Sequence, residues 1–164
     1  IKDKISDKEL ASLGYGYGLT ISPFQITSAY SVFANKGIYK DFKILKSDEV
    51  ALNRVISEDS AKHTLEALKE VVHIGTGKNA DINGYTEGGK TGTVHKTSYG
   101  NGYAEDSYRA SFVGIAPLSD KSLTIFVSID EPGLNAYSGG MIAAPLFKKI
   151  ADSSLNYLGY SEDE

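Results

Sequence analysis

The sequence predicts a chain of α/β composition and α+β layout, in which an antiparallel sheet is flanked by helices. Apolar residues recur at helical spacing in three segments, and three neighbouring segments between the second and third of these have strand character. The strand-like segments follow one another with short links, which favours an antiparallel meander. Helices before and after the meander can cover its faces.

The first predicted helix begins at Ser22-Pro23. Serine is a preferred N-cap residue, and proline suits the first helical position. Gly37 ends the helix as a C′ residue, and residues 38–46 form an extended, alternating stretch. The apolar positions at helical spacing are Ile26, Ala29, Tyr30 and Phe33.

A second helix is predicted from about Glu58 to Ile74, with Ser57 as its cap and Gly75 as its stop. A loop rich in glycine and asparagine occupies residues 75–89. The apolar stripe of the helix consists of Ala61, Leu65, Leu68 and Val72.

Three strands are predicted next. Residues 90–96 are rich in threonine and valine, whereas 108–116 and 123–129 alternate between two faces. A loop of glycine and tyrosine residues, 97–106, separates the first two strands.

The chain ends in a predicted helix from about Met141 to Leu158. Pro145 must lie in the first turn of this helix or kink it. Residues 161–164 are predicted to be a disordered tail.

Composition limits the function classes. The chain has 164 residues, of which 41% are hydrophobic and 23% charged, typical of one globular domain or part of a larger one. The net charge of −4 argues against a nucleic-acid binder. The absence of cysteine excludes disulfides and thiolate metal sites, and we expect no metal or cofactor. No apolar run reaches the roughly 18 residues of a membrane span, and no signal peptide is recognised.

Residues 84–91 match the phosphate-loop pattern of nucleotide hydrolases. Residues 123–130 also resemble an apolar strand that ends in a magnesium-binding aspartate. The context argues against this interpretation, because a phosphate loop follows a buried strand and opens a helix. Residues 75–83 are polar, and the segment after Thr91 contains too many glycines for a helix. We keep a nucleotide hydrolase as the less favoured alternative.

The same lysine belongs to a second pattern, Lys90-Thr91-Gly92-Thr93, which is a Lys-Thr-Gly strand motif. On a strand, Lys90 and Gly92 point to one face, and Thr91 and Thr93 to the other. The lysine supplies positive charge, the threonines supply hydroxyl donors for a carboxylate, and Gly92 lets a substrate backbone approach closely. On the motif alone, a charged edge strand without a binding role is an equal alternative.

Further segments accompany this motif in a fixed order. They resemble the C-terminal half of the transpeptidase domain of class B penicillin-binding proteins, of the cell-division (FtsI-like) type, over residues 14–158. The segments are Gly16-Tyr-Gly-Leu19, 27–37, 90–93, 108–117, Ile129-Asp-Glu-Pro132, Tyr137-Ser-Gly-Gly140 and Ala144-Pro-Leu-Phe147.

The resemblance implies the penicillin-recognising (β-lactamase-like) fold and a serine enzyme that cross-links peptidoglycan by acyl transfer. Lys90 would contribute electrostatics, Thr91 and Thr93 would bind the carboxylate of the substrate or β-lactam, and the N–H of Thr93 would form half of the oxyanion hole. Tyr17 and Tyr137 would line the region of the substrate side chain.

Two positions depart from the family pattern. His95 stands where a basic residue, often arginine, is expected near the cleft. Ser138 stands where relatives can carry an aromatic residue, so the apolar wall is expected to be weaker.

No serine in the sequence stands three residues before a lysine, as the nucleophile motif Ser-x-x-Lys of the family requires. We expect that motif, and two strands of the sheet, upstream of Ile1. Ser154-Leu-Asn156 has the letters of the Ser-x-Asn motif, but it follows the Lys-Thr-Gly strand, and we interpret it as a coincidence. Residues 1–164 are therefore expected to be the C-terminal portion of one transpeptidase domain, inactive alone.

The partners implied by the resemblance are a peptidoglycan stem peptide ending in D-Ala-D-Ala, β-lactam antibiotics, the upstream segment of the same parent protein and division-complex proteins. The implied location is the periplasmic face of the bacterial inner membrane. A β-lactam sensor or binding domain of the same fold, in which acylation signals instead of turning over, is an alternative.

Overall fold

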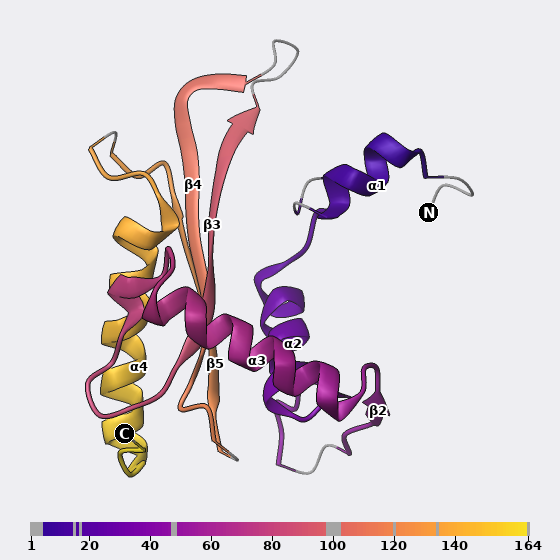
Figure 1. Ribbon diagram of the computed structural model, residues 1–164, viewed down its shortest axis with the longest axis vertical. Coiled ribbons are helices and arrows are strands. Elements are labelled where there is room, and N and C mark those ends of the chain that lie inside the picture. Colours follow the sequence, from indigo (N-terminus) through magenta and orange to yellow (C-terminus); the bar gives the residue numbers. More distant parts are fainter. Residues whose placement is uncertain are drawn as a thin grey trace.

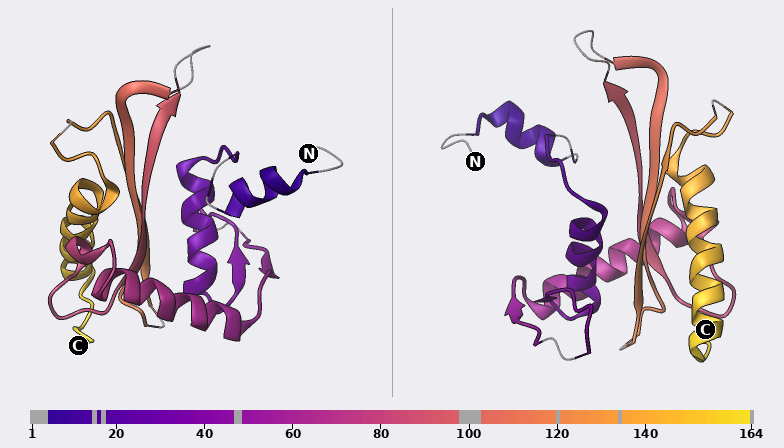
Figure 2. Two further views of the ribbon diagram at one scale, coloured as in Figure 1. Left: turned by 45° about the horizontal axis from the view of Figure 1, so that its top comes forward. Right: turned by 180° about the vertical axis from the view of Figure 1, so that it is seen from behind.

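The computed structural model describes residues 5–14, 16, 18–46, 49–97, 103–119, 121–133 and 135–163, with the backbone alone at 97 and 103–106. The elements in chain order are α1 (Asp7–Gly14), α2 (Pro23–Ala34), β1 (Ile38–Lys40), β2 (Leu52–Arg54), α3 (Glu58–His73), the 3₁₀-helix η1 (Lys78–Ala80), β3 (Gly88–Thr97), β4 (Tyr103–Ala116), β5 (Leu123–Asp130), the π-helix η2 (Gly139–Ala143) and α4 (Ala144–Leu158). As predicted, β3, β4 and β5 form an antiparallel meander. Helix α4 lies on one side of this sheet, and α2 and α3 lie on the other (Figures 1 and 2).

The core lies between the sheet and α4. The ring of Phe112 on β4 packs 4.9 Å from the ring of Phe147 on α4, and both side chains are fully buried. A Cβ atom added at Gly114 would lie 2.5 Å from the Phe147 ring, so this helix sits directly on the backbone of β4. On the opposite face, Gly88 of β3 lies against Leu68 of α3. These contacts fix which face of β3 points toward which helix.

Serine caps begin the helices on the N-terminal side. Ser22 and Gln25 form a capping box at α2, and Ser57 caps α3, as predicted for both serines. Helix α1 is absent from the predicted elements, although Ser6 and Glu9 stand at capping-box spacing. The Ser6 N–H donates to the Glu9 carboxylate at 3.0 Å, and the Glu9 N–H donates to Ser6 Oγ at 3.3 Å.

Several predicted segments differ in extent. Strands β3 and β4 are longer than the predicted 90–96 and 108–116, so the loop between them is shorter than the predicted 97–106. The stretch predicted to be extended over 38–46 is a strand only at Ile38–Lys40, because its partner β2 is equally short. The helix predicted from Met141 begins two residues earlier as the π-helix η2 and continues as α4. Pro145 lies in the first turn of α4, one of the two placements predicted for it.

The predicted disordered tail differs from the structure at Asp163. The carboxylate of Asp163 accepts from the N–H and the hydroxyl of Thr86, both at 2.7 Å, and its N–H donates to the Gly84 carbonyl at 2.9 Å. Charge-assisted hydrogen bonds of this kind can order a terminal segment whose polar composition predicts disorder. The end of the described chain is thereby joined to the turn that leads into β3.

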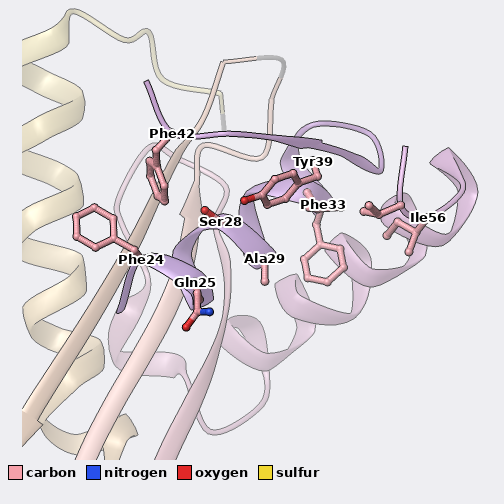
Figure 3. A pocket seen from close by; sticks show the side chains of 10 residues that line it. Phe24, Gln25, Ser28, Ala29, Phe33, Tyr39, Phe42 and Ile56 are labelled. Atoms are coloured by element: carbon pink, nitrogen blue, oxygen red, sulfur yellow. The ribbon is translucent and has the colours of Figure 1, made fainter. Parts of the chain in front are cut away.

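An apolar pocket of about 440 Å³ lies between α2 and the β1–β2 segment (Figure 3). Phe24 and Phe42 line it and meet edge to face, with ring centroids 5.1 Å apart. None of the described residues that line this pocket belongs to β3, so the pocket is separate from the Lys-Thr-Gly segment. Within the described part of the chain, every helix is too short or too polar to cross a membrane.

Candidate active site

The Lys-Thr-Gly segment lies within β3, an outer strand of the described sheet. The side chain of Lys90 is exposed, and its Nζ donates to the Thr91 carbonyl at 3.0 Å. Because Gly88 faces α3 and side chains alternate along a strand, Lys90 and Gly92 belong to the α3 side. Thr91 and Thr93 belong to the opposite side, which faces η2.

The extended backbone of β3 decides against the phosphate-loop alternative. A phosphate loop needs its lysine and threonine at the start of a helix, whose N-terminus binds the phosphate. Lys90 and Thr91 instead lie inside a strand of 10 residues. The nucleotide-hydrolase interpretation of residues 84–91 is therefore wrong.

The hydroxyl of Thr93 is held by η2. The Gly139 N–H donates to Thr93 Oγ1 at 3.1 Å. A Cβ atom at Gly139 would lie 2.3 Å from the Ser111 carbonyl oxygen and 2.6 Å from that of Gly92, so only glycine allows this approach. Because the Gly139 N–H occupies one lone pair of Thr93 Oγ1, the hydroxyl proton of Thr93 remains available for a ligand.

The hydroxyl of Thr91 has a partner from a different element. Its Oγ1 lies 2.9 Å from Oγ1 of Thr76, in the turn between α3 and η1. The same turn touches η2, because Asn79 Nδ2 donates to the Gly140 carbonyl at 2.8 Å. Thr76 was not among the predicted site residues. Its only sequence signal is its position between Gly75 and Gly77, directly after a predicted helix.

Three aromatic rings stack beside the same strand. His95 on β3 lies nearly parallel to Tyr108 on β4, with ring centroids 4.7 Å apart, and Tyr108 stacks on Tyr137 at 4.4 Å. Tyr137 is 43% exposed. The structure thus brings together the predicted residues His95 and Tyr137, through Tyr108, which we had not assigned to the site. The remaining predicted residue, Tyr17, lies outside the described residues.

An ion-pair cluster lies where β5 ends. Lys96 Nζ contacts Glu131 at 2.7 Å and Asp130 at 3.1 Å, and Arg109 contacts Asp130 at 3.0 Å. The hydrogen bond with Glu131 raises the pKa of Lys96, and the hydrogen bonds from Lys96 lower the pKa of Asp130 and of Glu131. The cluster is solvent-exposed, so it fixes the geometry of the strand ends more than it adds stability.

Taken together, these groups suit an anionic ligand. The outer strand carries a cationic side chain, Lys90, and two hydroxyls, Thr91 and Thr93, which can donate to a carboxylate. A metal-ion role has no support in the described residues, which contain no group of three or more histidine, cysteine, aspartate or glutamate residues that could hold a metal ion.

One known family matches most of the chain. The family described as penicillin binding protein transpeptidase domain matches residues 1–152. The chain belongs to this family. Its Lys-Thr-Gly strand, β3, lies within the matched part of the transpeptidase domain.

Three curated relatives cover most of the chain. It is 36% identical to stage V sporulation protein D of Bacillus subtilis over 96% of its length, 37% identical to the probable peptidoglycan D,D-transpeptidase PbpC of Pseudomonas aeruginosa over 98%, and 36% identical to peptidoglycan D,D-transpeptidase FtsI of Buchnera aphidicola over 91%. The chain spans 26%, 29% and 26% of these relatives, respectively.

Solved transpeptidase structures have the same fold. The apo transpeptidase domain of Burkholderia pseudomallei penicillin-binding protein 3 superposes with a TM-score of 0.85 at 37% identity, over 96% of this chain and 48% of that chain. Penicillin-binding protein 3 of Mycobacterium tuberculosis in complex with ampicillin gives a TM-score of 0.81 at 27% identity, over 98% of this chain and 40% of that chain. The predicted fold class, a helix-flanked antiparallel sheet of the penicillin-recognising type, is confirmed.

Proposed function

We propose that this chain is the C-terminal portion of the transpeptidase domain of a peptidoglycan D,D-transpeptidase. In this proposal β3 forms one wall of the site that binds stem peptides and β-lactams. The observation that carries it is Lys90-Thr91-Gly92-Thr93 on an outer strand, in a chain of the transpeptidase family. The names of the relatives, and a similar penicillin-binding protein solved in complex with ampicillin, support the same assignment.

The proposed reaction is acyl transfer from a stem peptide that ends in D-Ala-D-Ala. A serine hydroxyl from outside this chain attacks the carbonyl carbon between the two D-alanines, and the terminal D-Ala leaves as the free amino acid. The resulting ester passes its acyl group to an amine of a second stem peptide, which restores the serine. No step requires a cofactor or a metal ion.

The residues of β3 have defined roles in this scheme. Lys90 supplies positive charge next to the reacting groups, and the N–H of Thr93 donates to the oxyanion of the tetrahedral intermediate. The hydroxyls of Thr91 and Thr93 bind the terminal carboxylate. Gly92 lets the peptide backbone lie close to the strand.

The aromatic residues belong to the periphery of the proposed site. Tyr137, and by family pattern Tyr17, line the region of the substrate side chain, and His95 is connected to Tyr137 through the ring of Tyr108. The exposed ring of Tyr137 and its stacking through Tyr108 support this role.

The setting of the protein is also part of the proposal. We place it on the periplasmic face of the bacterial inner membrane, among division-complex proteins, as the resemblance to cell-division penicillin-binding proteins implies. The nucleophile motif is expected in an upstream segment of the same protein.

The test is release of D-Ala from a synthetic stem peptide by the complete protein to which the chain belongs. We expect turnover that falls by about 100-fold in Lys90→Met, because a charge that stabilises the transition state is removed. The matched control is Lys121→Met, an exposed lysine that the proposed site does not include, which should keep its activity. Absence of D-Ala release, or equal activity of both variants, would contradict the proposed function.

A further inference from the structure

Thr76, in the α3–η1 turn, touches the Lys-Thr-Gly strand. Its Oγ1 lies 2.9 Å from Oγ1 of Thr91. Thr76 is exposed and Thr91 is half-buried. The hydroxyl pair therefore lies within reach of a ligand at the strand and is not a contact of the protein core.

The turn holds Thr76 in place from two sides. The Gly77 N–H donates to the Val71 carbonyl at 2.9 Å, which closes the turn after α3. The carbonyl of Thr76 lies so close to Gly140 that a Cβ atom there would be 2.3 Å away, and Asn79 Nδ2 bonds the Gly140 carbonyl. Thr76 cannot move away from Thr91 without disturbing these contacts with η2.

Counting protons sets the direction of the Thr76–Thr91 hydrogen bond when an anion is bound. A threonine hydroxyl has one proton and two lone pairs. If Thr91 donates its proton to a carboxylate, it can only accept from Thr76, so Thr76 becomes the donor. Hydrogen bonds in a chain polarise one another, which makes Thr91 a stronger donor to the anion. The Gly139 N–H likewise donates to Thr93 Oγ1, which leaves the Thr93 proton for the anion.

We propose that Thr76 is a positioning residue of the carboxylate site, which donates to Thr91 Oγ1 and thereby directs the Thr91 proton toward the ligand carboxylate. This inference rests on the proposed function. It adds a residue from outside the Lys-Thr-Gly segment to those that select ligands ending in a carboxylate.

The experiment compares two acyl donors with the complete protein. Both are D-alanyl thioesters, identical except that one ends in a carboxylate and the other in a primary carboxamide. We expect Thr76→Val, which replaces the hydroxyl by a methyl group, to raise KM for the carboxylate donor about 3- to 10-fold, the effect of one lost hydrogen bond. The kcat for this donor, and both constants for the carboxamide donor, should change by less than about twofold.

Two further variants separate positioning from a structural role. Thr76→Ser keeps the hydroxyl and should restore the KM of the unmodified protein. In a Thr91→Val background, Thr76→Val should have no additional effect on KM, because Thr76 acts through Thr91. If Thr76→Val lowers the unfolding temperature by more than a few degrees, Thr76→Ala serves as the second variant without a hydroxyl.

The outcomes are distinct. An equal rise in KM for both donors, unchanged KM for the carboxylate donor, or additive effects of the two threonine substitutions would overturn the role of Thr76 alone. Failure of the unmodified protein to turn over either donor, or to be acylated by penicillin, would overturn the proposed function and this inference with it.

Discussion

At the scale of single residues, the site depends on a backbone contact that only glycine permits. Gly139 brings its N–H to Thr93 Oγ1 because nothing projects from its Cα toward the carbonyls of Gly92 and Ser111. Both obstacles to a side chain are backbone atoms of the sheet, so they cannot rotate away. The orientation of a hydroxyl on β3 is thereby tied to the position of η2.

We predict that Gly139→Ala lowers kcat/KM of the complete protein about 10- to 100-fold, because the added methyl group displaces η2 from β3. The control is Gly133→Ala, in the preceding loop, where a Cβ atom would meet nothing within 4 Å. Steady-state rates of D-Ala release measure both variants. Unchanged kcat/KM in Gly139→Ala would show that the Thr93–Gly139 contact is dispensable.

The sequence predicted only some of the residues of this candidate site. The letters Lys-Thr-Gly and the alternation rule predicted Lys90, Thr91 and Thr93 and the faces they belong to. The partners behind the two hydroxyls escaped prediction, because Thr76 is 15 residues from Thr91 and Gly139 is 46 residues from Thr93. Such pairs are set by tertiary packing and leave no local periodicity.

At the scale of elements, the ion-pair cluster connects the far ends of the strands. Lys96 of β3 reaches Asp130 and Glu131 at the end of β5, and Glu131 has a positive φ of 50°, an unusual backbone angle for a residue with a side chain. The Glu131 N–H also donates to the Tyr108 carbonyl at 2.9 Å. The cluster therefore fixes the corner from which the chain leads to Tyr137.

The contribution of this cluster to stability should depend on pH. Because the pKa of Lys96 is raised above its usual 10.5, its contribution is present below that pH and is lost as the pH rises through the folded-state value. Because the pKa values of Asp130 and Glu131 are lowered from 3.8 and 4.5, their contribution is present above these values and is lost on acidification through the folded-state values.

We therefore expect the difference in unfolding temperature between the unmodified protein and Lys96→Met to be largest between about pH 5 and 10 and to shrink on either side. High salt should reduce it, because exposed charges are screened. The control is Lys121→Met, which should show no such pH profile. A difference that stays constant from about pH 3 to 10 would mean that the ion pairs contribute nothing measurable.

The packing of α4 on the sheet gives a larger effect. Phe147 is fully buried against Phe112, so Phe147→Ala should lower the free energy of unfolding by about 3–5 kcal/mol through the cavity it leaves. Leu146, its neighbour on the same helix, is 40% exposed, and Leu146→Ala should cost clearly less. Denaturant titration measures both variants. Similar losses would contradict the assignment of Phe147 to the core.

Elements with strong periodicity were predicted well, and irregular ones were not. The meander and the capped helices α2 and α3 follow from alternation, apolar spacing and serine caps. Strand β2 was missed because three residues are too few to show alternation. The helix predicted from Met141 omitted the first two residues of η2 and its π-helical form, because a π-helix has no spacing signal of its own. Helix α1 was missed although Ser6 and Glu9 stand at the spacing of a capping box in the sequence.

At the scale of the whole molecule, the candidate site is assembled where separate elements meet an outer strand. The α3–η1 turn, β3 and η2 each contribute one part of the hydroxyl arrangement. The apolar pocket beside α2 is a separate feature (Figure 3). The net charge argued against a nucleic-acid binder, and the absence of cysteine excluded disulfides and thiolate metal sites. Only the order of the motifs along the chain predicted an acyl-transfer site.

The most direct test of this account is to acylate the complete protein with a labelled penicillin and to locate the label by peptide mass mapping. We predict one labelled serine, outside residues 1–164 and three residues before a lysine, and labelling that slows by about 100-fold in Lys90→Met but not in Lys121→Met. A label within residues 1–164 would contradict the predicted position of the nucleophile, and equal labelling rates for both variants would contradict the claim that β3 is a wall of the acylation site.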